Sequence, residues 1–566
     1  MTPIHPNGIQ PRPRRIAFAL YALFTLLAFP HELPGLGAFD LGLVSAWLGP
    51  AALVVALDGL SARRAAWRTF LASLLAHAVL FHWFIVVTVG YGGMPLALGL
   101  LSPLLPAYWV AQFSALFAGL WAGLARRRGA VWLGACAWVG LDWIRGSLFG
   151  GFPWATLGYA LHLDLPLLGL TRLGGVYVLS FMAALVGLAL GRLALDRLAS
   201  RPGRPLRSLA TIATGLVAAH LFGSGLAADA ADAADGGRDG ADPGGAVESV
   251  RIAAVQGDID QGEKWDAARR ERILATYLRL SDQAVAAGAR WIVWPETAVP
   301  GSLEWDRVLR ERIVGFARDR GVTLVVGGMG IAFTSGREGP SAYYDSAFVV
   351  DAEGRLRDRY DKVQLVPFGE FVPLRDWFGR FFQSLARGLS PDDVTAGPGV
   401  RAMSVPGTAE RPEGFRVGVP ICYELLFPDV VRRFVADGAG VLLAVTNDAW
   451  YGRTGAPHQF LAMTALRSAE TARFTVRAAN TGISAIIDAR GRVLERSRLF
   501  EEAVLVADVP VVRSRSTAPG RAREGATFYV RHGDFFAWSC MLLALVGLVI
   551  ERVTGRSSGG DPVSRG

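Results

Sequence analysis

The stretch Val417-Gly-Val-Pro-Ile-Cys-Tyr-Glu424 is a short, mostly apolar run that ends in a thiol and a carboxylate. Similar β-branched runs alternate with helical stretches through the C-terminal half of the 566-residue chain. That alternation is typical of a sheet covered by helices. The runs that we expect to be strands are 251–255, 291–294, 323–326, 415–419, 441–445, 484–488 and 503–508, and the expected helices are 266–287, 302–320 and 457–474. Residues 248–512 are therefore expected to form one large α/β domain.

The composition places a membrane part beside this domain. Hydrophobic residues make up 52% of the chain and charged residues only 19%, whereas soluble proteins carry about 25% charged residues. Because a spanning helix needs about 20 mostly apolar residues, we expect seven spans at about 16–31, 38–58, 69–90, 95–124, 130–147, 174–195 and 207–226, and an eighth at about 535–550. The pattern predicts a polytopic α-helical membrane bundle of eight spans and excludes a disordered, fibrous or purely soluble protein.

Arginine clusters indicate how the bundle is oriented. The net charge is +9, but the basic residues gather between apolar runs, which is typical of membrane topology. The clusters fall on every second loop and comprise Arg12, Arg14 and Arg15; Arg63, Arg64 and Arg68; Arg126, Arg127 and Arg128; Arg192, Arg197, Arg201, Arg204 and Arg207; and Arg552 and Arg556. We expect these loops and both termini in the cytoplasm, with everything between spans seven and eight outside.

The rest of the chain divides by composition. Residues 227–247, AADAADAADGGRDGADPGGAV, are acidic and Gly-rich and are expected to be a solvated linker. The α/β domain at 248–512 is followed by a return segment at 513–534, the eighth span and a cytoplasmic tail at 551–566.

Three polar residues follow or end apolar runs of the α/β domain and are candidates for catalysis. Glu296 follows Trp291-Ile-Val-Trp-Pro295, Cys422 follows Ile421, and Lys362 opens the run that ends at Glu370. Because ligand sites in α/β folds gather beyond the carboxyl ends of strands, these side chains could meet as base, nucleophile and oxyanion cation. Each also has an ordinary explanation, as a solvated turn carboxylate, a packed core thiol or a surface lysine. Spacing alone leaves the choice open.

Lysine usage singles out two positions. Of 58 basic residues only Lys264 and Lys362 are lysines, which indicates a need that a guanidinium group does not meet. Cys136 and Cys540 lie in apolar runs, as small core residues do. The eight histidines lack metal-ligand spacing, and Gly327-Gly-Met-Gly330 lacks the other parts of a nucleotide site. We therefore expect no metal, no cofactor and no nucleic-acid partner.

Four motifs resolve the ambiguity through a family resemblance. Trp294-Pro-Glu-Thr297, Lys362-Val-Gln-Leu-Val-Pro-Phe-Gly-Glu370, Ile421-Cys-Tyr-Glu424 and Thr446-Asn-Asp-Ala-Trp-Tyr-Gly452 together resemble the nitrilase (carbon–nitrogen hydrolase) superfamily. That resemblance implies an αββα sandwich for the α/β domain. The eight spans, with Gly151-Phe-Pro-Trp154 and Gly158-Tyr159, resemble the membrane-bound branch of the superfamily, the apolipoprotein N-acyltransferases. The resemblance covers essentially the whole chain except the linker and the two tails.

The resemblance implies a Glu-Lys-Cys triad. Glu296 would be the general base, Lys362 the cation that meets the developing oxyanion, and Cys422 the nucleophile. Glu370 would be a second glutamate that orients Lys362.

The same resemblance assigns residues around the triad. Tyr423 and Glu424 would shape the pocket, and Trp265 would lie in the substrate entrance. Gln364 departs from the family, which commonly has His at that position, and the departure bears on local packing more than on activity.

The reaction implied by the resemblance is a two-step acyl transfer in the bacterial inner membrane, with the catalytic domain on the periplasmic side. Cys422 would take an acyl chain from a phospholipid, typically phosphatidylethanolamine, and pass it to the α-amino group of the S-diacylglyceryl cysteine of an apolipoprotein. Two alternatives stay open at this point. One is a membrane-tethered amidase of the nitrilase type, and the other is a non-enzymatic membrane scaffold that carries an inactive domain.

Overall fold

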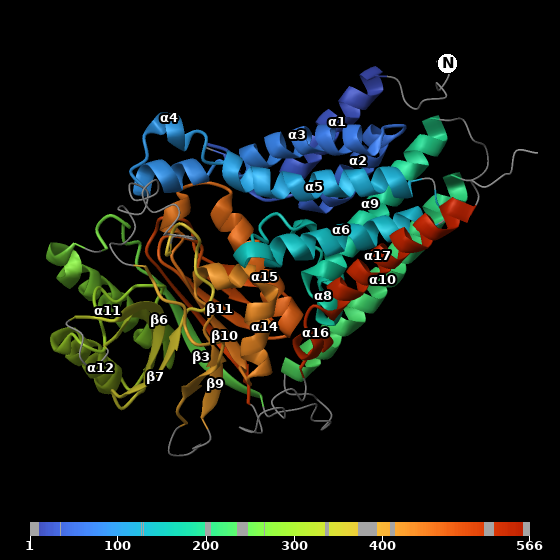
Figure 1. Ribbon diagram of the computed structural model, residues 1–566. Coiled ribbons are helices and arrows are strands. Elements are labelled where there is room, and N and C mark those ends of the chain that lie inside the picture. Colours follow the sequence, from blue (N-terminus) through green and yellow to red (C-terminus); the bar gives the residue numbers. More distant parts are fainter. Residues whose placement is uncertain are drawn as a thin grey trace, which may run out of the picture.

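The protein consists of a helical bundle packed against a two-sheet sandwich, as the computed structural model shows (Figure 1). The structure describes residues 11–33, 35–125, 127, 129–198, 205–234, 247–264, 266–333, 339–371, 393–407, 414–513 and 526–557. Trp265, which we expected at the substrate entrance, lies outside the described residues.

In the part of the chain that the structure describes, the bundle contains eight long helices and several short elements. The long helices are α1 (Pro11–Leu27), α2 (Gly42–Leu57), α3 (Ala62–Leu80), α5 (Leu104–Leu124), α6 (Ala130–Ser147), α9 (Val176–Leu198), α10 (Pro205–Ala234) and α17 (Phe535–Ser557). The short elements are β1 (His31–Leu33), β2 (Gly37–Phe39), η1 (Val86–Tyr91), α4 (Leu96–Gly99), η2 (Leu148–Gly150), η3 (Leu157–Leu161), α7 (Leu165–Leu168), α8 (Thr171–Gly174) and α16 (Phe528–His532).

Each predicted span falls on one of the long helices, but the helices differ in how clearly they qualify as spans. Among the described residues, three segments are long and apolar enough to cross a membrane: Leu96–Leu124, Val176–Leu198 and Leu209–Ala228. Gly42–Leu57 and Phe535–Ile550 are shorter apolar helices. Apolar helices are therefore present in the bundle, and the count of eight spans stays a prediction.

Several helices extend beyond the apolar segments that predicted them, and α3 and α10 are two examples. α3 begins at Ala62, so Arg63, Arg64 and Arg68 lie in its first turns and not in the loop where we expected them. α10 continues to Ala234, which takes the first eight residues of the expected linker into a helix. The repeat AADAADAA explains this second difference, because alanine has the highest intrinsic helix propensity.

The C-terminal half forms two six-stranded sheets. One has the order β14-β3-β4-β5-β6-β7 and the other β13-β12-β11-β10-β9-β8. The strands of the first sheet are β3 (Val247–Gln256), β4 (Trp291–Val293), β5 (Thr323–Ala332), β6 (Ala342–Val350), β7 (Leu356–Asp361) and β14 (Ala503–Val512). The strands of the second are β8 (Met403–Val405), β9 (Phe415–Gly418), β10 (Val441–Thr446), β11 (Thr475–Ala479), β12 (Ala485–Ile487) and β13 (Val493–Arg496).

The sheets pack face to face with helices on both outer faces, which confirms the expected sandwich (Figure 1). The helices are α11 (Arg270–Ala286) and α12 (Arg307–Arg320) on one side, and α14 (Pro428–Ala436) and α15 (Ala456–Thr471) on the other. Alternation along β3 shows the layering. Ile252 and Ala254 pack in the core between the sheets, while Ala253 and Val255 pack against α11 and α12.

The parallel strands bring their carboxyl ends to one edge. β3, β4 and β5 are parallel, and so are β9, β10 and β11. β7 is separated from β5 by two antiparallel pairings and so runs in the same direction as β5. All seven predicted strands are present, but three are clearly longer than predicted: β3 begins at Val247, β5 continues to Ala332 and β14 continues to Val512. Strands β6, β7, β8, β11 and β13 were not predicted.

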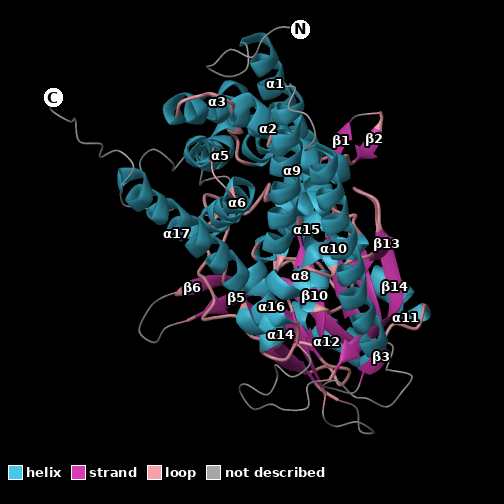
Figure 2. Cartoon of the chain, turned by 90° about the vertical axis from the view of Figure 1, so that its right-hand side faces the viewer, coloured by secondary structure: helices cyan, strands magenta, loops and turns pink. Residues whose placement is uncertain are grey.

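Helix α15 lies between the sandwich and the bundle, and every residue in it except His458 is buried (Figure 2). Gln459 accepts a hydrogen bond from Trp154 Nε1 at 2.7 Å and donates one to the carbonyl of Pro30 at 2.9 Å. Glu470 accepts from the main-chain N–H of Val176 at 2.7 Å. A helix with no solvated face needs such partners on all sides, so the two halves of the molecule pack as one body here.

This interface depends on a buried ion pair. Arg467 donates to Glu470 at 2.9 Å, and both side chains are almost fully buried. Removing the carboxylate in Glu470→Ala leaves the Arg467 cation buried without its partner, which costs about 3–5 kcal/mol. We expect a clear drop in melting temperature in detergent. The control is Glu311→Ala, which removes an exposed pair with Arg307 and should leave the melting temperature almost unchanged. Equal melting curves for the two variants would contradict the interface role.

Candidate active site

The three predicted catalytic residues lie beyond the carboxyl ends of strands in both sheets. Glu296 follows β4 by three residues, and Lys362 directly follows β7. Cys422 directly follows Ile421, which bridges to Val445 of β10. The structure therefore brings together Glu296 and Lys362 from one sheet and Cys422 from the other, at the edge where the sheets meet.

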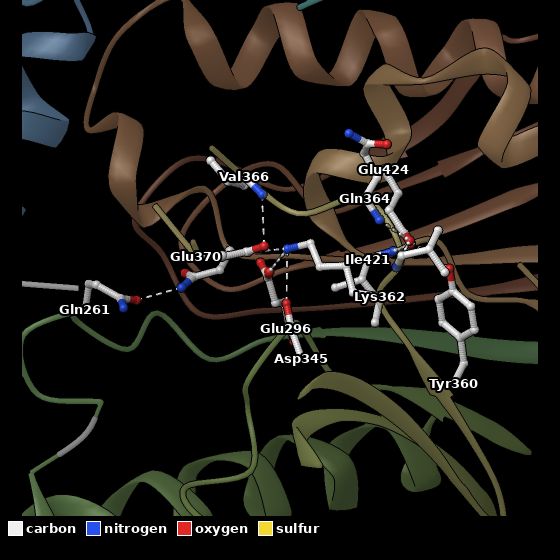
Figure 3. Close-up of polar contacts among 12 residues, drawn as sticks. Gln261, Glu296, Asp345, Tyr360, Lys362, Gln364, Val366, Glu370, Ile421 and Glu424 are labelled. Atoms are coloured by element: carbon white, nitrogen blue, oxygen red, sulfur yellow. Dashed lines mark hydrogen bonds and ion pairs between the residues drawn. The ribbon is translucent and has the colours of Figure 1, made fainter. Parts of the chain in front are cut away.

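Lys362 is the centre of the site (Figure 3). Its side chain is fully buried, and Nζ donates to Glu296 Oε1 at 3.0 Å, Asp345 Oδ2 at 3.1 Å and Glu370 Oε1 at 2.5 Å. An ammonium has three N–H donors, so each of them has a carboxyl partner. Burial by itself would lower the pKa of Lys362, but the neighbouring Glu296, Glu370 and Asp345 raise it well above its usual value. The group is therefore a permanent positive charge.

Glu296 is the carboxylate best placed to act as a base. Its side chain is buried, and burial would raise its pKa, but the Lys362 charge and hydrogen bonds from Asp345 and Lys362 lower the pKa overall. The segment around it is tightly packed. A Cβ at Gly327 of β5 would lie 2.2 Å from the Pro295 carbonyl oxygen and 2.7 Å from Glu296 Cα, so only glycine fits beneath this turn.

Asp345, in β6, completes the carboxyl cluster and was missed by the sequence analysis. Burial raises the pKa of Asp345 well above its usual range, and hydrogen bonding to Glu296 raises it further, against the opposing charge of Lys362. We therefore expect Asp345 to be the protonated member of this carboxyl pair and to donate to the Glu296 carboxylate. Oxygens of Glu296, Asp345 and Glu370 lie within 4.8 Å of one another, as metal ligands do, but here the Lys362 ammonium donates to all three.

Cys422 is buried and strained. It begins the short helix η5 (Cys422–Leu426) with φ +46°, a conformation that non-glycine residues rarely adopt. Burial raises the pKa of the Cys422 thiol well above its usual value, and the charge of Glu296 adds to this, while Lys362 and the main-chain N–H of Asn447 oppose it. The resting pair is therefore a thiol beside a carboxylate.

Strain recurs in the same small region. Thr297, next to Glu296, has φ +47°, and Phe368, within the lysine motif, has φ +63°. Such conformations cost about 1–3 kcal/mol each and gather at functional sites. Each of the three catalytic motifs thus holds one strained residue.

Two further glutamates fix the segments that carry the lysine and the cysteine. Glu424 is fully buried and accepts from Ile421 N–H and Val363 N–H, both at 2.8 Å, and from the Tyr360 hydroxyl at 2.7 Å. Burial raises the pKa of Glu424 to about 7 despite these hydrogen bonds. Glu370 bonds Lys362 with one oxygen and Val366 N–H, at 3.0 Å, with the other. Glu424 thus fixes the main chain on both sides of the site and Glu370 contacts the Lys362 ammonium, while the pocket role of Glu424 and the orienting role of Glu370 stay predictions.

The bundle forms one wall of the site. The Tyr423 hydroxyl donates to the Gly151 carbonyl at 3.4 Å, and Gln364 Nε2 donates to the Gly150 carbonyl at 3.0 Å. Tyr451, after β10, packs against Trp83 and Trp154 with ring centroids 5.0 and 5.8 Å apart. Gln364, where the sequence departs from the family pattern, thus joins the lysine segment to the loop after α6.

Sequence comparisons agree across both halves of the chain. The carbon-nitrogen hydrolase family model matches residues 251–519, and the model of the apolipoprotein N-acyltransferase N-terminal domain matches residues 21–189. An apolipoprotein N-acyltransferase from Geobacter metallireducens is 35% identical over 94% of this chain and 95% of its own length. Another from Azotobacter vinelandii is 33% identical over 97% of each. Among solved structures, an amidase of the nitrilase superfamily from Nesterenkonia matches 46% of this chain and 90% of its own, at 22% identity and a TM-score of 0.34.

The protonation of Asp345 can be tested by substitution. An amide resembles a neutral carboxylic acid, so Asp345→Asn should keep the hydrogen bonds to Lys362 and Glu296 and alkylate at Cys422 within about threefold of the wild-type rate. Asp345→Leu removes both hydrogen bonds and leaves one N–H of the buried Lys362 ammonium without an acceptor. This loss should lower the free energy of unfolding by about 1–3 kcal/mol. Alkylation by iodoacetamide, followed by mass spectrometry of the Cys422 peptide, measures both. A hundredfold change in Asp345→Asn would mean that Asp345 acts as an anion.

Proposed function

The chain belongs to the apolipoprotein N-acyltransferase family, whose function is the N-acylation of lipoproteins, and we propose that it performs this reaction in two steps through a thioester on Cys422. One observation carries the proposal. Glu296 and Lys362 are hydrogen-bonded at 3.0 Å, and the buried Cys422 follows the Ile421 bridge to β10 at the same edge, where both charges act on its thiol, so base, nucleophile and oxyanion cation share one buried site.

In the first step Glu296 takes the thiol proton as sulfur attacks the ester carbonyl of a phospholipid. The carbonyl oxygen becomes an oxyanion, which the Lys362 ammonium and the Tyr423 main-chain N–H stabilise. Tyr423 lies in the first turn of η5, where N–H groups lack acceptors inside the helix. The intermediate collapses by breaking the ester C–O bond, and Glu296 returns the proton to the leaving lysophospholipid.

In the second step the α-amino group of an S-diacylglyceryl cysteine attacks the thioester. Glu296 accepts a proton from this amine, an amide bond forms, and the C–S bond breaks. The Cys422 thiolate regains the proton, which restores the resting thiol beside a carboxylate. The triad and this ping-pong order are our proposal, supported by the charge arrangement around Lys362.

Lipid substrates account for the contact between the site and the bundle. The loop that contacts Tyr423 and Gln364 also carries Phe149, which is 87% exposed and lies against Trp109 of α5. Exposed apolar side chains are stable in a bilayer, whereas in water they promote aggregation. An acyl chain in the membrane would therefore meet this loop before the thiol. We propose phosphatidylethanolamine as donor and a diacylglyceryl apolipoprotein as acceptor.

The amidase alternative is not favoured. It would use the same three residues, but relatives that match through the helical half and the sandwich together are named apolipoprotein N-acyltransferases. An amidase that transfers its acyl group to water has no use for the loop after α6.

Removal of the nucleophile tests the proposal. Cys422→Ala should release lysophospholipid and form N-acylated lipopeptide at least about a thousandfold more slowly, because no covalent route remains. Cys136→Ala, in helix α6 of the bundle, is the matched control and should keep the wild-type rate. Product formation in Cys422→Ala at a rate near that of the control would overturn the proposed mechanism.

We further propose that the catalytic domain lies on the periplasmic side of the inner membrane, with both termini in the cytoplasm. The start of α1 and the last turns of α9 and α17 lie at the end of the bundle away from the sheets (Figure 1). Arginine clusters at that end favour a cytoplasmic location. Alkaline phosphatase inserted at residues 235–246 should therefore be active, and the same enzyme fused after Arg556 inactive. The reverse pattern would invert the proposed topology.

A further inference from the structure

Lys264, the second of the two lysines in the chain, lies in the active site although the mechanism above does not use it. It follows β3 on a loop, is 2% exposed, and donates from Nζ to the main-chain carbonyl of Glu296 at 2.9 Å. Both lysines of a chain with 58 basic residues therefore hydrogen-bond to the same glutamate, one to its side chain and one to its main chain.

The two lysines differ in how their charge is balanced. Lys362 donates to three carboxyl groups. In the described part of the chain, Lys264 donates to the Glu296 carbonyl and no carboxylate accepts a hydrogen bond from it. Burying a cation without a paired anion is costly, and packing alone would be served by an uncharged side chain. The charge of Lys264 is therefore retained for a reason other than packing.

The charge of Lys264 faces the reacting groups. Burial lowers the pKa of Lys264 to about 8, while Glu296, Asp345 and Cys422 oppose that change. The ammonium is thus still mostly protonated at neutral pH, and its hydrogen bond to the Glu296 carbonyl holds its charge next to the carboxylate that serves Cys422. The other charged or titratable groups that face Cys422 are Glu296, Lys362, Tyr451 and Asp448, and Asp448 is paired with Arg477 at 2.6 Å.

We propose that Lys264 is a positioning residue for the Glu296–Cys422 pair, which fixes the main chain of Glu296 and supplies a second positive charge that stabilises the Cys422 thiolate as its proton leaves. The inference rests on the proposed function of Cys422 as nucleophile. When the proton moves to Glu296, the negative charge moves from Glu296 to sulfur. Lys362 already donates to three carboxyl groups, whereas Lys264 donates to a main-chain carbonyl. The Lys264 ammonium is therefore expected to stabilise the new negative charge on sulfur more strongly.

Two substitutions separate the charge from the hydrogen bond. Lys264→Gln keeps an N–H donor for the Glu296 carbonyl and removes the charge, whereas Lys264→Met removes both. The full-length protein in detergent is alkylated with iodoacetamide between pH 6 and pH 10, and the Cys422 peptide is quantified by mass spectrometry. We expect both variants to slow alkylation roughly tenfold at pH 7, where the wild-type Lys264 is mostly charged, and the difference from the wild type to shrink above pH 8 as Lys264 loses its proton. Acyl-enzyme formation from phosphatidylethanolamine should show a similar loss in kcat with little change in KM.

The matched control is Arg270→Gln, because Arg270 donates to the Pro300 carbonyl on the same segment at 2.8 Å but lies away from the thiol. It should keep the wild-type pH profile. A wild-type profile in Lys264→Gln would overturn the charge role, whatever the behaviour of Lys264→Met. Failure of the proposed function would look different, since Cys422→Ala would then still form product.

Discussion

The site depends on one buried positive charge, the ammonium of Lys362, held by three carboxyl groups. A charge without solvent is stable only when its partners are fixed in place. Glu296 comes from the turn after β4, Asp345 from β6 and Glu370 from the segment after β7. The ammonium therefore cannot be satisfied until the first sheet and its edge loops have formed. Glu424 extends the same constraint to the second sheet, because it binds the main chain on both sides of the site.

The segments that hold the buried charge also contact the helical bundle, which links the site to the membrane part of the chain. The lysine and cysteine segments contact the loop after α6 through Gln364 and Tyr423, and α15 is buried between the second sheet and the bundle. In the proposed mechanism, a nucleophile that reacts with lipids must be shielded from water yet lie close to the bilayer. The buried rings of Trp83, Trp154 and Tyr451 pack together between the site and the helices, which suits both requirements.

Strand ends could be predicted from sequence, whereas contacts between distant segments could not. Short β-branched runs predicted β4 and β10 closely, and polar residues beyond such runs pointed to Glu296 and Cys422. Asp345 lies within a strand that paired with β5 and β7 only in the structure, so nothing local distinguished it from a surface aspartate. Lysine usage singled out Lys264, but its contact with Glu296 spans 32 residues along the chain and could be seen only in the folded structure. The acidic composition of residues 227–247 led us to expect a linker throughout. The high helix propensity of their first alanines instead extends α10 to Ala234.

The central claim is that an acyl chain rests on Cys422 between donor and acceptor. The most direct measurement is the intact mass of the full-length protein after incubation with a phospholipid of defined acyl length and no acceptor. The account predicts a gain of one acyl chain on the Cys422 peptide, labile to hydroxylamine and lost when a diacylated lipopeptide is added and becomes triacylated. Triacylated product formed at full rate without any adduct on Cys422 would contradict it.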